Sequence, residues 1–497
     1  MDNLDLYNYS NLETGSKSVE EVADLMKAMS AGDQTGRDLN NTDTSGSSLK
    51  TESLDPSLKV LTNSAQDIVL YKMIPKEKAY NTVEEYNQLK DYGLDGTGIF
   101  NTEGETPQFT DSIYTRRSVL IKYTGIAGEV THPYSLVRLG SGVGNALAKE
   151  VQNKMQFLVR SINTALPTGN SDMVSEEFDG LFKQHYDGIV GATGTLDDYA
   201  NSSAVIDARG KALTDANVED SVNAVVNDGF GVANTIIGNP SIFNDYVKRF
   251  HESKRVNVNN PTDATTGATM GQKVNVIATQ FGNINIKHDI FFDRKVPVLY
   301  NAASTNAKSP ATPTVGGTPT AVNTDASTKF TDGAGSYFYG VRAKNRYGES
   351  AMLLFSTSAQ AVLATQSVDL SFSQTDNAYA AESFVIYRTK VDATPYTTAK
   401  FYPIFTISAL ERTNGYDGGT AGLVRDRNRS IAGTYSALVM DFNPDVVALK
   451  QLAPMMRMDL ARTSPAYRFM VLCYLTPVIY APKKIAKITN IGSDITE

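Results

Sequence analysis

At 497 residues the chain exceeds what one hydrophobic core serves, so we expect two to four domains. Its formal net charge of -8 argues against a protein that coats nucleic acid. Its one cysteine, Cys473, excludes an intrachain disulfide framework and a zinc site of the cysteine type. Because Cys473 lies in an apolar run, we expect a small buried residue without chemistry. We find no signal peptide and no apolar run long enough to cross a bilayer, so we expect a cytosolic protein without membrane contact.

Residues 1–60 are polar and acidic and predict a largely flexible arm. One helix is expected inside it, with Ser18 as N-cap and Glu21 three residues later. The apolar face of that helix consists of Val22, Leu25, Met26 and Met29.

A polar, turn-rich stretch, Asn81 to Ser112, lies between two runs that we interpret as strands, Ile68 to Met73 and Ile113 to Ile126. Long extensions between strands are uncommon in compact domains and are usually functional or intermolecular. We therefore predict a projecting two-stranded loop. Its returning strand carries a basic group of three residues, Arg116, Arg117 and Lys122, and such groups are usually solvated.

Apolar residues recur at intervals of three and four from Leu136 to Ile162, which predicts a long helix from Ser135 to Asn163. Glycines 140, 142 and 144 weaken its first turns, so the helix is expected to kink or to begin near Asn145. These glycines resemble a dinucleotide-binding loop only loosely, because no clean strand precedes them.

Residues 170–300 alternate helix and strand signals and predict a compact α+β domain. Within it we expect helices at Val218 to Val226 and Ser241 to Phe250, and a loop at Asn257 to Gly271. Strands are expected at Thr235 to Gly238, Val274 to Thr279 and Asn285 to Phe292.

Beyond a linker at Ala302 to Thr320 the pattern becomes all-β and ends near Asp426. Short alternating strands separated by turns predict a sandwich of roughly 100 residues. One predicted strand places four side chains on one face: Tyr337, Tyr339, Val341 and Ala343. The spacing of Tyr339 to Ser350 resembles a strand and turn of a fibronectin type III domain.

The most continuously apolar run is Tyr467 to Tyr480, which we interpret as one or two strands buried on both faces. It follows Gln451 to Arg462 and precedes a tail with three lysines, Lys483, Lys484 and Lys487. We therefore expect the chain to close its core after the sandwich.

No catalytic or cofactor motif stands out. The four histidines, His132, His185, His251 and His288, lack metal-ligand spacing, and Walker A, His-Glu-x-x-His and Gly-x-Ser-x-Gly patterns are absent from the sequence. An arm, a projecting loop, a long helix and an inserted sandwich are devices for contacting other chains. The sequence favours assembly over catalysis, so we expect no enzyme activity, cofactor or metal.

Three C-terminal segments carry a family resemblance: Gln451-Leu-Ala-Pro-Met-Met-Arg-Met-Asp-Leu-Ala461, Phe469-Met-Val-Leu-Cys-Tyr474 and Ala481-Pro-Lys-Lys-Ile-Ala-Lys-Ile-Thr-Asn490. They resemble the C-terminal signature of major capsid proteins of large contractile-tailed phages, the SPO1-like and Twort-like group. Glu177-Phe-Asp-Gly-Leu181 and Gly229-Phe-Gly-Val-Ala-Asn234 also match. The similarity covers most of residues 60–497.

The resemblance implies an α+β fold of the HK97-like capsid type with an inserted all-β immunoglobulin/fibronectin-like sandwich. On this basis the chain divides into an N-terminal arm, an E-loop region, a P-domain spine helix, an A/P-domain core, the sandwich and a C-terminal return to the core. The corresponding residues are 1–60, 61–130, 131–169, 170–304, 305–426 and 427–497.

The resemblance also implies a major capsid protein that forms hexamers and pentamers of an icosahedral head, enclosing double-stranded DNA without sequence-specific binding. Expected partners are a scaffold or maturation protease, portal and decoration proteins, with assembly in the host cytoplasm and a final location in the virion capsid. Candidate intersubunit contacts are Arg116, Arg117, Lys122, Arg457, Arg462, Lys483 and Lys484.

Two alternatives remain at this point. A tail or baseplate protein could also carry a fibronectin-like module, although the repeats of a trimeric fibre are absent. A surface protein could bind glycans through tyrosines of the sandwich, although Tyr337 and Tyr339 fit a core better.

Overall fold

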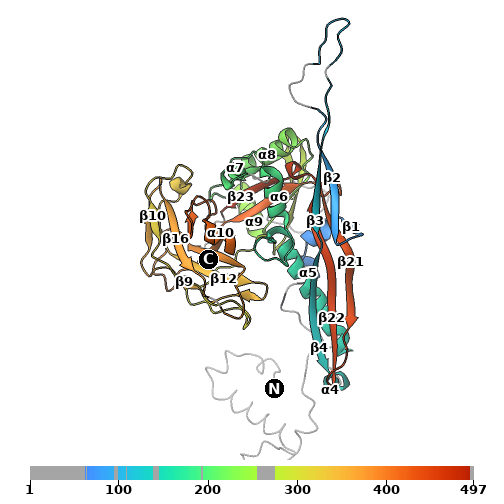
Figure 1. Ribbon diagram of the computed structural model, residues 1–497, viewed down its shortest axis with the longest axis vertical. Coiled ribbons are helices and arrows are strands. Elements are labelled where there is room, and N and C mark those ends of the chain that lie inside the picture. The colour runs from blue at the N-terminus through green and yellow to red at the C-terminus, as the bar shows by residue number, and fades with distance from the viewer. Residues whose placement is uncertain are drawn as a thin grey trace, which may run out of the picture. The chain divides into compact units, whose positions relative to one another are not determined.

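The computed structural model describes residues 62, 64–93, 99–107, 109–137, 145–191, 194–253, 275–375 and 377–492 (Figure 1). The predicted arm, residues 1–60, and the predicted loop Asn257–Gly271 lie outside these residues. Residues 62–134 and 147–497 belong to one compact unit, and the architecture below is that of its described part.

A four-stranded sheet has the strand order β1-β21-β22-β4. Its strands are β1 (Lys76–Lys78), β21 (Val447–Asp459), β22 (Ala466–Ile479) and β4 (Lys122–Thr131). The closing stretch of the sequence is thus a long hairpin, with β22 antiparallel to both β21 and β4. The prediction that this run is buried on both faces is confirmed only from Leu475 to Ile479. From Tyr467 to Tyr474 burial alternates, because one face alone packs on the core there.

The predicted projecting loop is present as an antiparallel hairpin of β2 (Val83–Asp91) and β3 (Ile113–Leu120), which extends beyond the four-stranded sheet (Figure 1). Strand β2 lies inside the turn-rich stretch Asn81 to Ser112. One detail of the prediction is wrong, because Lys122 lies on β4 rather than on the returning strand. Buried Ile121 marks the passage from β3 into β4.

The long helix is α5 (Ala146–Thr168), preceded by α4 (His132–Leu136). A start near Asn145 is confirmed, whereas Leu136 is exposed in α4 and does not join the apolar face of α5. Leu139 and Val143 lie outside the described residues. Val151, Leu158 and Ile162 are buried against the four-stranded sheet, as the 3.6-residue period requires.

A six-stranded sheet has the order β5-β23-β20-β6-β8-β7. Its strands are β5 (Val205–Asp207), β23 (Ala486–Ile491), β20 (Tyr435–Met440), β6 (Thr235–Gly238), β8 (Gly282–His288) and β7 (Val276–Thr279). The associated helices are α6 (Leu181–Val190), α7 (Leu196–Ala200), α8 (Asp215–Asn223), the π-helix η4 (Ala224–Asp228), α9 (Pro240–Ser253) and the 3-10 turn η6 (Pro482–Lys484).

Strand β23 corrects the sequence interpretation, which placed Lys487 in a tail. It is an inner strand, parallel to β5 and antiparallel to β20. The expected strand Asn285–Phe292 also ends early, at His288, because Asp289 begins a turn. Alternate residues of the sheet face two cores: Ile236 and Val439 pack with α8 and α9, and Ile237 and Leu438 pack toward α5.

The all-β region contains two main antiparallel sheets, β10-β16-β19 and β13-β12-β17-β18, with β9 and β14 attached to β16 and β12, and a third sheet of two strands, β11-β15. Its elements are β9 (Thr314–Val315), β10 (Thr320–Val322), η5 (Phe330–Asp332), β11 (Gly335–Tyr337), β12 (Tyr339–Asn345), β13 (Gly348–Glu349), β14 (Leu353–Leu354), β15 (Gln360–Val362), β16 (Ser367–Ser373), β17 (Ser383–Thr389), β18 (Phe401–Ser408), α10 (Ala409–Asn414) and β19 (Leu423–Asp426). The two main sheets share one core.

The predicted alternation in this region is confirmed. Tyr337, Tyr339, Val341 and Ala343 all lie in the shared core. On β17, Phe384 and Ile386 enter the same core, while Val385 and Tyr387 enter a second cluster on the opposite face. The region therefore buries both faces of its larger sheet.

A buried carboxylate connects three distant segments. Asp289 Oδ2 accepts hydrogen bonds from the amides of Val69 and Leu70 at 3.0 and 2.9 Å, at the start of α3 (Leu70–Met73). The same oxygen accepts from Asn163 Nδ2 at 2.8 Å, and Oδ1 accepts from the amide of Phe291 at 2.8 Å. Asn163 Oδ1 in turn accepts from the amide of Tyr71 at 2.8 Å. These bonds explain why Ile68–Met73 begins a helix rather than the predicted strand.

We expect Asp289→Ala to destabilise the protein by about 3–5 kcal/mol, because four donors would lose their acceptor in a buried site. Urea unfolding at neutral pH measures the effect. Asp445→Ala, at an exposed position, is the control and should change stability by less than about 0.5 kcal/mol. Equal unfolding midpoints for the two variants would show that the carboxylate does not hold these segments.

Candidate assembly surfaces

The tip of the β2/β3 hairpin exposes large apolar side chains. Phe100 is 93% exposed and Phe109 is 95% exposed, and Ile99, Tyr92 and Tyr114 are also mostly exposed. A folded subunit rarely leaves so much apolar surface in contact with water unless another chain covers it. The hairpin tip is therefore a candidate surface for contact with a partner.

The three residues of the predicted basic group, Arg116, Arg117 and Lys122, lie on two strands: the arginines on β3 and the lysine on β4. Arg116 forms an ion pair with Glu85 at 3.3 Å across the hairpin, and both side chains are more than half exposed. Arg117 is on the same strand, opposite Tyr86. The ammonium of Lys122 donates to the carbonyl oxygen of Ser175 at 2.5 Å, so Lys122 is engaged within its own chain.

The other candidate contact residues are in two places. Arg457 and Arg462 lie in the β21/β22 hairpin, where Arg457 pairs with Asp459 at 2.5 Å and Arg462 stacks over the ring of Tyr467. Lys483 and Lys484 form the end of η6, between the two C-terminal strands. These four residues therefore lie on elements other than β3, which carries Arg116 and Arg117, and the predicted contact residues do not share one element.

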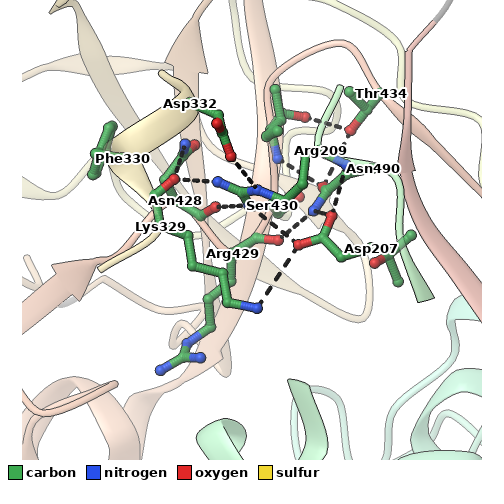
Figure 2. Close-up of polar contacts among 12 residues, drawn as sticks. Asp207, Arg209, Lys329, Phe330, Asp332, Asn428, Arg429, Ser430, Thr434 and Asn490 are labelled. Carbon is green, nitrogen blue, oxygen red and sulfur yellow. Dashed lines mark hydrogen bonds and ion pairs between the residues drawn. The ribbon is translucent and has the colours of Figure 1, made fainter. Parts of the chain in front are cut away.

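A polar junction joins the all-β region to the six-stranded sheet (Figure 2). Arg209, which follows β5, reaches both sides: its Nη1 pairs with Asp207 at 3.1 Å and its Nε pairs with Asp332 at 3.1 Å. Its guanidinium also donates to the backbone carbonyl of Lys329. One side chain thus connects the sheet edge with the η5 turn.

Asn490 of β23 supplies a second connection in Figure 2. Its amide Nδ2 donates to Asp207 Oδ1 and to the Arg429 carbonyl, both at 2.8 Å. Its Oδ1 accepts from the Ile431 amide at 3.0 Å. Both hydrogen-bonding ends of this buried amide are therefore satisfied, which fixes where the chain leaves the all-β region.

Charged side chains reinforce this junction. Arg429 bridges Asp197 of α7 and Asp417, with nitrogen–oxygen distances of 2.7 Å to each carboxylate. Arg427 pairs with Asp325 at 2.8 Å and with Asp417 at 3.1 Å. Burial alone would raise the pKa of Asp197, but the hydrogen bond and charge of Arg429 hold that pKa below its usual value.

The backbone at the junction is strained. Arg209, Asn428 and Asn490 all have positive φ, at 52°, 57° and 54°. Such angles are uncommon outside glycine and persist only where surrounding contacts enforce them. The side chains of these three residues also form hydrogen bonds at the junction, so the backbone angles and the contacts support the same geometry.

The tyrosines considered for sugar stacking are not on the surface. Tyr337 is 4% exposed and Tyr339 is 1% exposed. Tyr339 donates to Asp426 Oδ2 at 3.0 Å, and that carboxylate pairs with buried Arg388 at 2.6 Å. Arg388 also donates to Asn428 at 2.6 Å, which continues the polar chain to the junction. Glycan binding through these two tyrosines is excluded by their burial.

Two buried titratable side chains connect α6 with β23 and the residue before it. His185 is fully buried on α6, with Nε2 2.9 Å from the Ile485 carbonyl oxygen and Nδ1 2.9 Å from the Tyr199 hydroxyl. Because a carbonyl only accepts, Nε2 carries the proton. Burial, with a smaller contribution from the charge of Lys487, lowers the pKa of His185 to about 4. Burial also lowers the pKa of Lys487 to about 8, and its ammonium lies 3.9 Å from the centre of the Phe182 ring.

The remaining features are structural. Cys473 is buried, as predicted, and burial raises its thiol pKa to about 11. Among the described residues no group of three or more His, Cys, Asp or Glu side chains could hold a metal ion. No helix in the described part of the chain is long and apolar enough to cross a membrane.

Sequence reasoning missed the junction, because its partners are far apart in the chain and carry no motif.

We expect Arg429→Ala to lower stability by about 3 kcal/mol, because it removes two bonds from Asp417, a carboxylate only 5% exposed. Arg346→Ala is the matched control, since it breaks a contact with Glu176 in which both side chains are about half exposed. That control should cost less than about 1 kcal/mol. Urea unfolding of the two variants compares them, and equal losses would show that the Arg429 contact contributes no more than a surface pair.

We expect stability to fall as the pH falls from about 6.5 to about 4 because of His185. In this pH window the imidazole is protonated in the unfolded chain but stays neutral in the folded protein, where it is buried. The resulting loss in the free energy of unfolding levels off below pH 4 at on the order of 3 kcal/mol. Unfolding of His185→Gln should lack this component, while His132→Gln, at an exposed position, should retain it. Identical pH profiles for wild type and His185→Gln would contradict this assignment.

Comparisons with known proteins identify the family. The family described as SU10 major capsid protein matches residues 38–329, more than half of the chain. The major capsid protein of Staphylococcus phage S25-3 is 26% identical over 481 residues, covering 92% of this chain and 93% of that protein. The putative major capsid protein of Enterococcus phage phiEF24C is 26% identical over 451 residues, covering 90% and 91%.

Among solved structures, the holo-SrpI encapsulin complex from Synechococcus elongatus PCC 7942 aligns over 92% of this chain and 99% of that chain, at 8% identity and a TM-score of 0.41. A likeness at this level adds no argument to the sequence relationship. The resemblance to the Twort-like group that the C-terminal motif indicated is confirmed by the Staphylococcus phage relatives. The chain therefore belongs to the SU10 major capsid protein family and is a phage major capsid protein with a structural, capsid-forming role.

Proposed function

We propose that this chain has the HK97-like capsid fold and tiles an icosahedral head as hexamers and pentamers around double-stranded DNA. The observation that carries this proposal is the β2/β3 hairpin, whose apolar tip has no cover within the described part of the chain. One chain that occupies both six-fold and five-fold settings needs extended, adaptable contacts, and a hairpin supplies them. The virion capsid is the location of such a protein.

The parts of the chain fit this role. We assign 61–130 to the E-loop region, 131–169 to the spine helix, and 170–304 with 427–497 to the core that the six-stranded sheet organises. Residues 1–60 would form the arm. We assign 305–426 to an inserted sandwich of immunoglobulin or fibronectin type on the outer surface of the shell. Its two main antiparallel sheets with one shared core support this assignment.

We further propose that assembly takes place in the host cytoplasm with the help of a scaffold or maturation protease and a portal, and that decoration proteins can bind the shell. The net charge of -8 supports a container whose subunits do not bind the packaged DNA by sequence. We keep Arg116 and Arg117 as candidates for pairing with acidic residues of a neighbouring subunit, because neither is buried and the partners of Arg116, Glu85 and Asn87, are exposed. Arg457, Arg462, Lys483 and Lys484 remain proposed contacts.

Negative-stain microscopy of the purified chain should show closed shells or capsomers. Phe100→Ser with Phe109→Ser should reduce shell formation on the order of tenfold, because it removes the exposed apolar tip. Its subunit melting temperature should not change, since both side chains are more than 90% exposed. Arg116→Glu with Arg117→Glu tests the charge contact in the same assay.

Unimpaired shells from the phenylalanine variant would contradict a role of the hairpin tip in assembly. Unimpaired shells from the arginine variant would remove only the proposed charge contact. The control is Leu363→Ser, which changes an exposed leucine of the all-β region and should leave assembly unchanged. Phe182→Ser would not serve as a control, because Phe182 packs on the core.

A further inference from the structure

A second apolar projection lies at the loop Gly229–Ala233, after the π-helix η4. Phe230 is 86% exposed and has a φ of 51°, and Val232 is 66% exposed. A bulky residue at positive φ is a backbone outlier, and π-helical turns occur frequently at functional sites. A strained backbone that presents an aromatic ring to solvent has no evident use in the isolated subunit.

Contacts on both sides hold this loop in place. The amide of Gly229 donates to the Ala224 carbonyl at 3.2 Å, and that of Gly231 donates to the Val225 carbonyl at 3.0 Å. A Cβ atom at Gly229 would lie only 2.0 Å from the carbonyl oxygen of Lys483, so the loop packs directly on η6. Phe230 therefore projects from a preformed support and needs no reorganisation to bind.

Opposite charges lie on the neighbouring elements. Lys483 is exposed and Lys484 is partly exposed at the end of η6, beside the loop. Helix α8, which leads into η4, exposes Glu219 and Asp220. Within the described residues none of these four side chains forms an ion pair.

The two charged groups are complementary in sign, and neither is neutralised by an ion pair within the described residues. A second copy of the chain could therefore bring the basic projection of one subunit against the acidic helix face of another.

We infer that Phe230 and Val232, flanked by Lys483 and Lys484, contact the acidic face of α8 in a second copy of this chain. The contact is head-to-tail, because each subunit supplies the projection to one neighbour and the helix face to another. Such a contact closes into a ring when the rotation permits. This inference rests on the proposed function, and it adds a capsomere contact separate from the β2/β3 hairpin.

Phe230→Gly tests the projection, because glycine accepts the positive φ without strain. The melting temperature of unassembled Phe230→Gly subunits should equal or exceed that of wild type. The protein concentration needed for half-assembly, measured by sedimentation, should rise on the order of tenfold. Leu363→Gly, which also removes an exposed apolar side chain, is the control and should assemble like wild type.

Charge reversal identifies the partner surface. Lys483→Glu with Lys484→Glu should impair assembly, and so should Glu219→Lys with Asp220→Lys. A chain with all four substitutions should recover assembly, because each reversed surface then meets a reversed partner.

The proposed contact would be overturned if Phe230→Gly reached half-assembly at the wild-type protein concentration, or if the fourfold variant did not recover assembly. Either result would leave the proposed function in place. A wild-type chain that forms neither shells nor capsomers would instead count against the proposed function and remove the basis for this contact.

Discussion

The structure depends on a buried carboxylate that holds together segments distant in sequence. Asp289 binds backbone amides 219 and 220 residues away at the start of α3, together with Asn163 on the long helix α5. These bonds set where the chain first meets α5. Because the apolar face of α5 packs on the four-stranded sheet, they also set the base from which the hairpin extends. A projecting contact surface is useful in a shell only if its base is rigid, and this carboxylate provides one such constraint.

The order of the chain creates a second constraint. Strand β23, the last strand, lies between β5 and β20, so the six-stranded sheet is incomplete until the chain has passed through the whole all-β region. Contacts at the junction hold both ends of the all-β region close to this sheet. Arg209 contacts the η5 turn near the beginning of that region, and Asn490 contacts Arg429 just after its end. Tying both ends to the neighbouring strands β5 and β23 allows a region of about a hundred residues to be inserted without disturbing the core that closes after it.

Sequence patterns predicted those parts of the fold in which local periodicity decides the structure. The three- and four-residue spacing of Val151, Leu158 and Ile162 predicted the buried face of α5, and alternation predicted the inward residues of β12. The family resemblance came from a C-terminal motif, and the relatives confirm it. Strand β23 was missed because Lys487 lies within it, and a lysine among charged neighbours suggests a solvated tail. The short helix at Ile68–Met73 was missed because its cap is Asp289, far away in sequence. Most of the junction shows no sequence signal, since arginines and aspartates separated by more than a hundred residues give no pattern until the fold brings them together.

Two apolar projections, the hairpin tip and Phe230, are the surfaces through which we propose that copies of the chain bind one another. Hydrogen exchange compared between unassembled subunits and closed shells tests this most directly, because it reads every backbone amide in both states. The account predicts that amides of Ile113–Leu120 and Gly229–Ala233 exchange more slowly in shells. The amides of Leu70 and Tyr71, already bonded to Asp289 and Asn163, should be equally protected in both states. Shells in which the hairpin exchanges as fast as in free subunits would contradict the claim that copies of the chain bind one another through it.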